Sequence, residues 1–148
     1  MPPRVALVFN ALPGMAAAAR GRLGEVVWEA ALRVERGAKY RAPVDTGFLR
    51  NSIQAHRTGE VRAEVAVGAE YGAAVEFGTG VFTTDPQAPR RPFTRRTRRG
   101  RLVTVQGQRP QPYLTPAVEE ERARFERECG AAVERAARDA GGRDTWRS

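Results

Sequence analysis

The run between residues 21 and 40 constrains the fold more than any other part of the sequence. Apolar residues recur in it at steps of three and four, with charged residues between them; they are Leu23, Val27, Ala30, Val34 and Ala38. This spacing predicts a helix over residues 15–41. The helix is expected to stop at Ala42, because the residue before Pro43 is pushed out of the helical region. Three glycines lower its intrinsic helix propensity: Gly21, Gly24 and Gly37.

The triplet Asp45-Thr46-Gly47 follows this helix and has the sequence of an aspartic-protease catalytic triplet. Such an aspartate needs a buried apolar strand before it and a second carboxylate opposite, and no second D-T/S-G triplet occurs in the chain. In a turn, by contrast, Asp45 can bond backbone N–H groups one turn ahead and Gly47 can take a positive φ. The triplet is therefore predicted to be a turn, and no catalytic residue is assigned.

The middle of the chain predicts strands and a short helix. Residues 4–9 are expected to form one strand, and the alternating runs 52–57 and 60–68 predict an antiparallel hairpin joined by Thr58-Gly59. One face of the hairpin is apolar and carries Val61, Ala63, Val65 and Val67. The next segment predicts a short helix closed by Gly78, with Tyr71, Val75 and Phe77 along one side.

The last long run predicts a second amphipathic helix. Thr115 is expected as its N-cap and Pro116 at its first position, with Glu119, Glu120 and Glu121 near its positive end. Its apolar stripe is Val118, Phe125, Cys129, Ala132 and Ala136. We therefore expect one α+β domain over residues 1–140, with a small antiparallel sheet packed against a long N-terminal helix and a C-terminal helix. Residues 141–148 are expected to form a flexible tail.

The composition excludes several classes of function. Cys129 is the only cysteine and His56 the only histidine, so neither an intramolecular disulfide nor a Cys/His metal site is expected. Cys129 is interpreted as a small core residue and His56 as a solvated or hydrogen-bonded side chain. No apolar stretch reaches eighteen residues, so no membrane span is expected. The N-terminal apolar run is broken by Asn10, Pro13 and Gly14 and is a poor signal peptide, so synthesis in the cytosol is expected.

Charge is distributed unevenly along the chain. Lys and Arg number 25 against 17 Asp and Glu, which gives a formal net charge of +8. Residues 86–118 contain eight arginines and no acidic residue, so the rest of the sequence sums to zero. The segment around residues 80–110 is predicted to be a long basic loop or extended hairpin, with one strand at residues 101–107.

Three fragments occur in a fixed order: APVDTGFLRNSI, VGAEYGAAVEFGTG and PQPYLTPAVEEE. Together they resemble the tail-completion, or head–tail joining, proteins of long-tailed bacteriophages, a family also found in prophages and gene transfer agents. The resemblance covers roughly residues 20–135 and implies structural and interface positions without a catalytic site or cofactor. The matching positions are Asp45, Thr46, Gly47, Leu49 and Ser52 in the first motif, Tyr71, Val75, Glu76, Phe77, Gly78 and Thr79 in the second, and Pro112, Tyr113, Leu114, Pro116 and Ala117 in the third.

The resemblance implies a structural virion protein at the head–tail junction, assembled in the bacterial host cytoplasm. It implies a closed, sixfold ring of copies that contacts the stopper or connector, the tail terminator and the tail tube. A subunit of the tail-terminator ring is the alternative. Glu76 beside Phe77 suits an interface with an apolar anchor and a polar rim, and equally a core phenylalanine beside a surface glutamate.

The basic segment departs from the family pattern, and three interpretations of it stay open. It contacts DNA in the channel through phosphates, docks on an acidic face of a neighbouring ring, or is a solvated loop that orders on assembly. The arginines concerned are Arg90, Arg91, Arg95, Arg96, Arg98, Arg99 and Arg101. A free, non-specific nucleic-acid-binding protein is the competing function, supported by Phe93 among these arginines.

Overall fold

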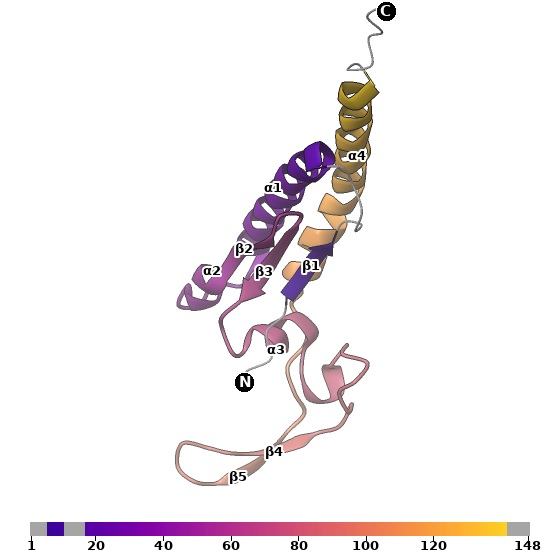
Figure 1. Cartoon of the computed structure of the whole chain (residues 1–148). Helices are drawn as coiled ribbons and strands as arrows, with labels where there is room; N and C mark the ends of the chain where they lie inside the picture. Colours follow the sequence, from indigo (N-terminus) through magenta and orange to yellow (C-terminus); the bar gives the residue numbers. More distant parts are fainter. Residues whose placement is uncertain (1–5, 11–16, 142–148) are drawn as a thin grey trace, which may run out of the picture.

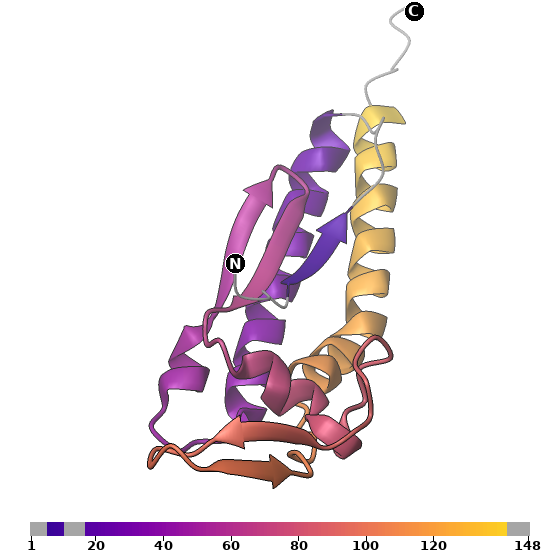
Figure 2. The same ribbon diagram turned by 90° about the horizontal axis from the view of Figure 1, so that it is seen from below.

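The computed structural model describes residues 6–10 and 17–141 of the chain. Strands β1 (Ala6–Asn10), β2 (Ile53–Gly59) and β3 (Arg62–Val67) form an antiparallel sheet in the order β1-β3-β2. Helix α1 (Ala17–Arg41) packs against this sheet and against helix α4 (Leu114–Gly141), and the two helices run side by side along the long axis (Figures 1 and 2). The predicted α+β architecture is confirmed.

The two alternating runs pair as an antiparallel hairpin, as predicted, but the residues of the hairpin turn were predicted wrongly. Ile53 lies opposite Val67 and Ala55 opposite Val65 in the β2–β3 hairpin. Residues 58 and 59 belong to β2, and the turn is formed by residues 60 and 61. A register shift near the end of β2 accommodates an extra residue and moves the turn along the chain. The predicted strand 4–9 corresponds to β1, apart from residues 4 and 5, which lie outside the described residues.

The core lies between α1, the sheet and the first turns of α4. Small aliphatic side chains of α1 meet the apolar face of β2 and β3, and Tyr113 and Leu114 close one end. The buried residues at its centre are Val27, Ala31, Val34, Ala38, Ile53, Ala63, Val65, Val67, Tyr113, Leu114 and Ala117. The predicted stripe of α1 is therefore confirmed, and so is the predicted face of the hairpin at Ala63, Val65 and Val67; Val61 lies in the turn and is half-buried.

Two of the glycines in α1 lie where neighbouring backbone comes close. A Cβ atom on Gly24 would lie 2.2 Å from the carbonyl oxygen of Glu60 in the hairpin turn. A Cβ atom on Gly37 would lie 3.2 Å from the Cβ of Ala117 on α4. A Cβ atom on Gly21 would have no neighbouring atom of the described residues within 4 Å. The helix therefore accepts glycine at two positions because larger residues would push the turn and α4 away.

Charged side chains join α1 to α4 beside the core. Arg33 donates to Glu121 at 2.7 Å and to Glu128 at 2.6 Å. Burial alone would lower the pKa of Arg33, but the two carboxylates raise it above its usual value. The pKa of Glu128 is lowered by the hydrogen bond from Arg124 and by Arg33, against the opposing effect of burial. These half-buried pairs align the two helices, because each partner would lose its counter-charge if one helix shifted.

The apolar stripe of α4 is as predicted, but the helix begins earlier than predicted. Ala132 and Ala136 are buried, and Val118, Phe125 and Cys129 are half-buried. Burial and the nearby Glu128 raise the pKa of the Cys129 thiol, which suits a packing residue better than a nucleophile. Thr115 was predicted as N-cap, but the helix already includes it and begins at Leu114.

Helix α2 (Phe48–Ser52) lies between α1 and β2. The segment between the sheet and α4 contains four short elements, of which the first two are helix α3 (Gly72–Phe77) and a 3₁₀ turn, η1 (Gly80–Phe82). Strands β4 (Phe93–Arg96) and β5 (Leu102–Val105) form a separate antiparallel hairpin. We call residues 83–105 the basic arm. It lies at the end of the molecule opposite the end of α4 (Figure 1). The described helices include none that is long and apolar enough to cross a membrane.

Candidate functional site

The three sequence motifs meet at one end of the molecule. The first forms the turn after α1 and helix α2, the second forms α3, and the third forms the start of α4. Figure 2 shows these elements grouped beside the basic arm. We call the turn of residues 42–47, α2, α3 and the first turn of α4 the motif end.

The DTG triplet is a turn, as predicted. Gly47 has a φ of 80° and precedes α2, a conformation that glycine adopts without strain. The predicted bond from Asp45 to the backbone ahead is replaced by a long one, 3.4 Å, from the N–H of Phe48 to the hydroxyl of Thr46. Asp45 is exposed, whereas a protease aspartate is buried beside a second carboxylate.

Ser52 joins the first motif to the second. Its hydroxyl donates to the carbonyl of Leu49 at 2.8 Å and accepts the N–H of Ala69 at 3.1 Å. Leu49 is buried under α2. Ser52 and Leu49 therefore hold α2 against the segment that leads into α3, and their role is internal.

Glu76 is the central residue of the motif end and joins the second motif to the third. It is 2% exposed, and its carboxylate accepts three backbone N–H groups. Those of Tyr113 and Leu114 lie at 2.8 and 2.9 Å from one oxygen, and that of Thr115 lies at 2.8 Å from the other. Since Pro116 has no N–H, these bonds satisfy the free donors at the start of α4. Glu76 caps α4 from 38 residues away in sequence.

This position for Glu76 differs from both predicted positions, an interface rim and a plain surface. Burial alone would raise the pKa of Glu76, but hydrogen bonds from Thr115, Leu114 and Tyr113 lower it below its usual value. A negative charge at a helix N-terminus is further favoured by the helix dipole. Phe77 is half-buried and lines an open hollow beside α3.

Tyr113 completes the same junction from the third motif. It is fully buried, and its hydroxyl donates to the carbonyl of Gly72 at 3.1 Å. A Cβ atom on Gly72 would lie 3.0 Å from that hydroxyl and 2.7 Å from Val67. Burial and the neighbouring Glu76 and Tyr71 raise the pKa of Tyr113, so the hydroxyl remains a donor. Leu114 is buried, whereas Pro112 is exposed and Pro116 half-buried.

The exposed surface of the motif end carries large apolar side chains. Phe48 is 57% exposed and Tyr71 45%, and their ring centroids lie 6.3 Å apart. Val44, in the preceding turn, is 58% exposed. An open hollow of about 410 Å³ adjoins them and reaches the buried Val75. Of the predicted motif positions, Tyr71 is the one that combines a large apolar side chain with exposure.

The two ends of the basic arm come together at a closed neck. The N–H of Thr79 donates to the carbonyl of Gln108 at 2.9 Å, and that of Val81 to Gln106 at 2.8 Å. A Cβ atom on Gly80 would lie 2.2 Å from Gln106, and one on Gly107 would lie 2.0 Å from Thr79. Both glycines have positive φ, 62° and 120°. Gly78, with a φ of 71°, closes α3 as predicted.

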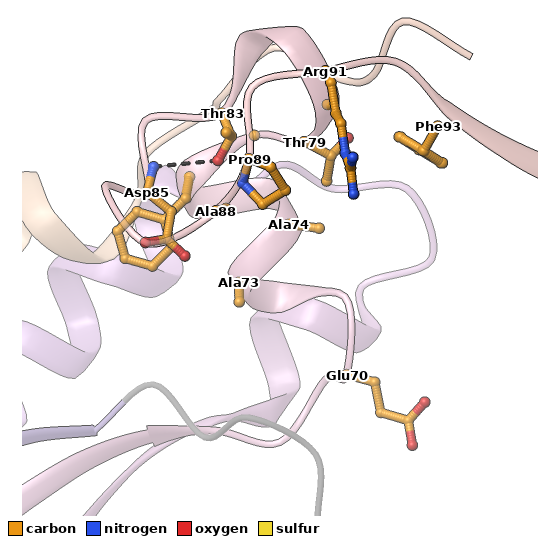
Figure 3. Close-up of a pocket in the computed structure, with 13 residues that line it drawn as sticks. Glu70, Ala73, Ala74, Thr79, Thr83, Asp85, Ala88, Pro89, Arg91 and Phe93 are labelled. Carbon is orange, nitrogen blue, oxygen red and sulfur yellow. Dashed lines mark hydrogen bonds between the residues drawn. The ribbon is translucent and has the colours of Figure 1, made fainter. Parts of the chain in front are cut away.

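Beyond the neck, an open hollow of about 530 Å³ lies between α3 and the arm. Figure 3 shows Ala73 and Ala74 of α3 on one side and Pro89 and Arg91 of the arm on the other. The side chain of Thr83 accepts the N–H of Asp85 at 3.2 Å at the start of the arm. The arm is thus joined to the body through its neck, with space between it and α3.

The segment that was predicted to be a long basic loop or an extended hairpin contains a hairpin. Phe93 lies opposite Val105, and Arg96 lies opposite Leu102. The hairpin tip is closed by a 2.8 Å bond from the N–H of Thr97 to Arg101, and Gly100 has a φ of 79°. The arginines of the arm are exposed: Arg90, Arg91, Arg95, Arg96, Arg98, Arg99 and Arg101. The predicted strand at residues 101–107 corresponds to β5, while β4 was not predicted.

Other chemistry-bearing residues do not gather at this end. His56 is exposed on β2, and Cys129 lies on α4. Within residues 6–10 and 17–141, no group of three or more His, Cys, Asp or Glu side chains is placed to hold a metal ion.

Comparison with known proteins shows that part of the chain is similar to a family of bacteriophage tail components. Residues 12–78 match the HK97-gp10-like family model, whose description reads "Bacteriophage HK97-gp10, putative tail-component". The predicted resemblance to a phage tail family is therefore confirmed over this segment, which includes the first motif and the second as far as Gly78. The basic arm and the third motif lie outside the matched segment. Searches of curated proteins and of solved structures found no significant match.

Proposed function

We propose that this protein is a structural subunit of the neck of a phage-like particle. It forms part of a ring at the head–tail junction that completes the tail and joins it to the DNA-filled head. Its work is assembly, and it carries out no catalytic step. The match to a tail-component family supports the general role, and the apolar surface of the motif end supports assembly through that end.

The observation that carries the proposal is the exposed apolar surface beside a rigid junction. Phe48 and Tyr71 lie on elements that Ser52 and Glu76 hold in place, and Val44 lies in the turn just before α2. Where a protein exposes several large apolar side chains close together, the patch is typically a site of contact with another protein. Aromatic anchors surrounded by polar groups are typical of protein interfaces. We expect the motif end to meet a different face of the next copy.

The proposed partners follow from this placement. Copies of the chain form a closed ring of six, with the stopper or connector on one side and the tail terminator and tail tube on the other. Each interface in such a ring joins two different faces of the same chain. A subunit of the tail-terminator ring itself is the alternative, and the position of the ring in the particle distinguishes the two.

Complementation of a particle-producing strain that lacks the gene tests the proposal. We expect the deletion to yield separate heads and tails in negative-stain micrographs, and the wild-type chain to restore joined particles. A Phe48→Asp, Tyr71→Asp variant is expected to fail, because two carboxylates would replace the apolar anchors. Asp at position 71 is acceptable before α3, since Tyr71 occupies the N-cap position.

The matched control is Val133→Asp, which places a charge at a side chain that is 40% exposed on α4. It is expected to restore joined particles like the wild type. Joined particles in the deletion strain would refute the proposed function. Equal failure of both variants, with both proteins folded, would refute the motif end as the contact surface.

A further inference from the structure

We infer that the basic arm binds the phosphate backbone of duplex DNA, independently of sequence. The inference deepens the proposed function and rests on it for the source of the DNA, which is the packaged duplex passing the junction. It is drawn from the shape of the arm, from the positions of its arginines and from the absence of ion pairs to them within the described residues.

The arm is a two-stranded ribbon of a size that suits a DNA groove. Strands β4 and β5 are four residues each and lie about 5 Å apart, as paired strands do. The major groove of B-DNA is about 12 Å wide and admits a two-stranded β-ribbon. All four residues of β4 are exposed, so the ribbon is accessible along its length.

The arginines are distributed around the ribbon instead of on one face. Successive residues of a strand point to opposite faces, so Arg95 and Arg96 project from opposite faces of β4. Arg98 and Arg99 lie in the tip, and Arg101 directly precedes β5. An acidic protein surface would contact one face and leave the rest in water. The two phosphate walls of a groove present negative charge on both sides of an inserted ribbon.

The exposed face of the ribbon also carries groups that contact phosphate. Register places Thr94 opposite Thr104 and Arg96 opposite Leu102, which puts these four side chains on one face. All four are exposed. Threonine hydroxyls and arginine side chains are common donors to phosphate oxygens. The other face holds Val103 and Val105, which are half-buried.

No arginine of the arm forms an ion pair within the described residues, although Asp85 and Glu70 line the same hollow as Arg91. The ion pairs found there join residues of α1, α4 and β2, and none includes residues 90–101. Residues 86–118 contain no acidic residue. Arg96 donates to the carbonyl of Gly100 at 2.8 Å, which shapes the tip and leaves its charge uncompensated. A polyanion would therefore meet arginine side chains whose positive charge is not neutralised by an ion pair within the described residues.

The test is binding of the purified full-length chain to a labelled 30-base-pair duplex of arbitrary sequence, measured by fluorescence anisotropy between 50 and 200 mM NaCl. The arm variant replaces Arg95, Arg96, Arg98 and Arg99 with Gln. The control variant replaces four exposed arginines elsewhere with Gln: Arg36, Arg50, Arg122 and Arg127. Both variants lose four charges, so net charge alone cannot separate them. Circular dichroism and the thermal midpoint verify that each is folded.

We expect the wild type to bind with strong salt dependence, and the control variant to bind with nearly the same slope of log K against log salt. Each phosphate contact contributes about −0.9 to that slope. The slope of the arm variant is therefore expected to be less negative by about 3 to 4, and its affinity at least tenfold lower. Equal weakening of both variants would overturn the inference. So would wild-type binding that does not depend on salt.

The particle assay keeps this inference separate from the proposed function. If the deletion strain fails to join heads and tails but the wild-type chain does not bind the duplex, the inference is wrong and the proposed function stands. If the chain binds the duplex through the arm but the deletion strain makes joined particles, the arm binds DNA and the proposed function is wrong.

Discussion

At the scale of single residues, the family positions divide into internal and external ones. Glu76, Tyr113, Ser52 and Leu49 hold the motif end together from inside, whereas Tyr71 is on its surface. Glu76 was missed as an internal residue because its partners are 37 to 39 positions away. One signal pointed to it: the residues just before α4 are Pro112 and Tyr113, neither of which can cap a helix through its side chain.

Replacing Glu76 with Gln should destabilise the fold by about 3 kcal/mol, because charged acceptors contribute more than neutral ones and the amide adds a donor that faces other donors. Urea unfolding followed by circular dichroism measures the change. Glu70→Gln is the matched control, because Glu70 is exposed and its carboxylate accepts no hydrogen bond from the described residues. A loss of equal size in both variants would contradict the capping role.

The lowered pKa of Glu76 also predicts a dependence on pH. A carboxylate with a lowered pKa in the folded state adds stability above its unfolded pKa, about 4.3, and loses it as pH falls through the folded value. The free energy of unfolding should therefore fall below about pH 4.3, and less steeply in Glu76→Gln. Glu128 contributes in the same direction in both proteins, so the difference between the curves isolates Glu76. If the unfolding free energy fell with pH equally in the wild type and in Glu76→Gln, Glu76 would not be a source of the pH dependence.

At the scale of elements, sequence periodicity predicted the long pieces and failed on the short ones. The stripes of α1 and α4 and the alternation in β3 each repeat over enough residues to be recognised. Helix α2 has five residues, too few for a helical period, and is formed by contacts through Leu49 and Ser52. Strand β4 has the sequence Phe-Thr-Arg-Arg and no apolar alternation, so the sequence allowed an extended hairpin in this segment but did not locate its first strand.

A pair of substitutions in α1 tests whether its glycines serve the packing. Gly21→Ala should stabilise the protein by up to about 1 kcal/mol, because the site is open and alanine favours helix. Gly24→Ala should destabilise it by about 1 to 3 kcal/mol, since the new Cβ would collide with the carbonyl of Glu60. Thermal unfolding of both variants gives the comparison. Stabilisation by both would show that the hairpin turn moves freely away from α1.

The neck of the arm is open to a similar test. Gly107→Ala should loosen it, because the position has a φ of 120° and its Cβ would lie 2.0 Å from the carbonyl of Thr79. Hydrogen exchange of the Thr79 and Val81 amides, which bond across the neck, should become faster while amides of α1 are unchanged. Gly130→Ala, at an open site on α4, is the control and should leave the neck protected.

At the scale of the whole molecule, the body and the arm are separable. Residues 83–105 include one buried residue, Thr83, and leave the body through the neck at Val81 and Gln106. Replacing this arm with a two-residue Asn-Gly turn removes seven arginines and one aspartate, so the formal net charge falls from +8 to +2. We expect the shortened chain to unfold in one cooperative step within a few degrees of the wild type, and to elute much earlier from a cation-exchange column. Loss of cooperative unfolding would show that the arm is part of the core structure.

The arm carries a formal charge of +6 and the body one of +2, so positive charge is concentrated at the end of the molecule opposite the end of α4 and the charge distribution is asymmetric along its length (Figure 1). In a closed ring of equally oriented copies, the radial components of this asymmetry cancel by symmetry and the axial components add. If the long axis of the monomer lies along the axis of the proposed ring, the two rims differ in potential, and the rim that holds the arms is the more positive. Equal orientation places the positive arms of adjacent copies side by side, so the long-range field opposes this polarity and the contacts between copies must outweigh the repulsion.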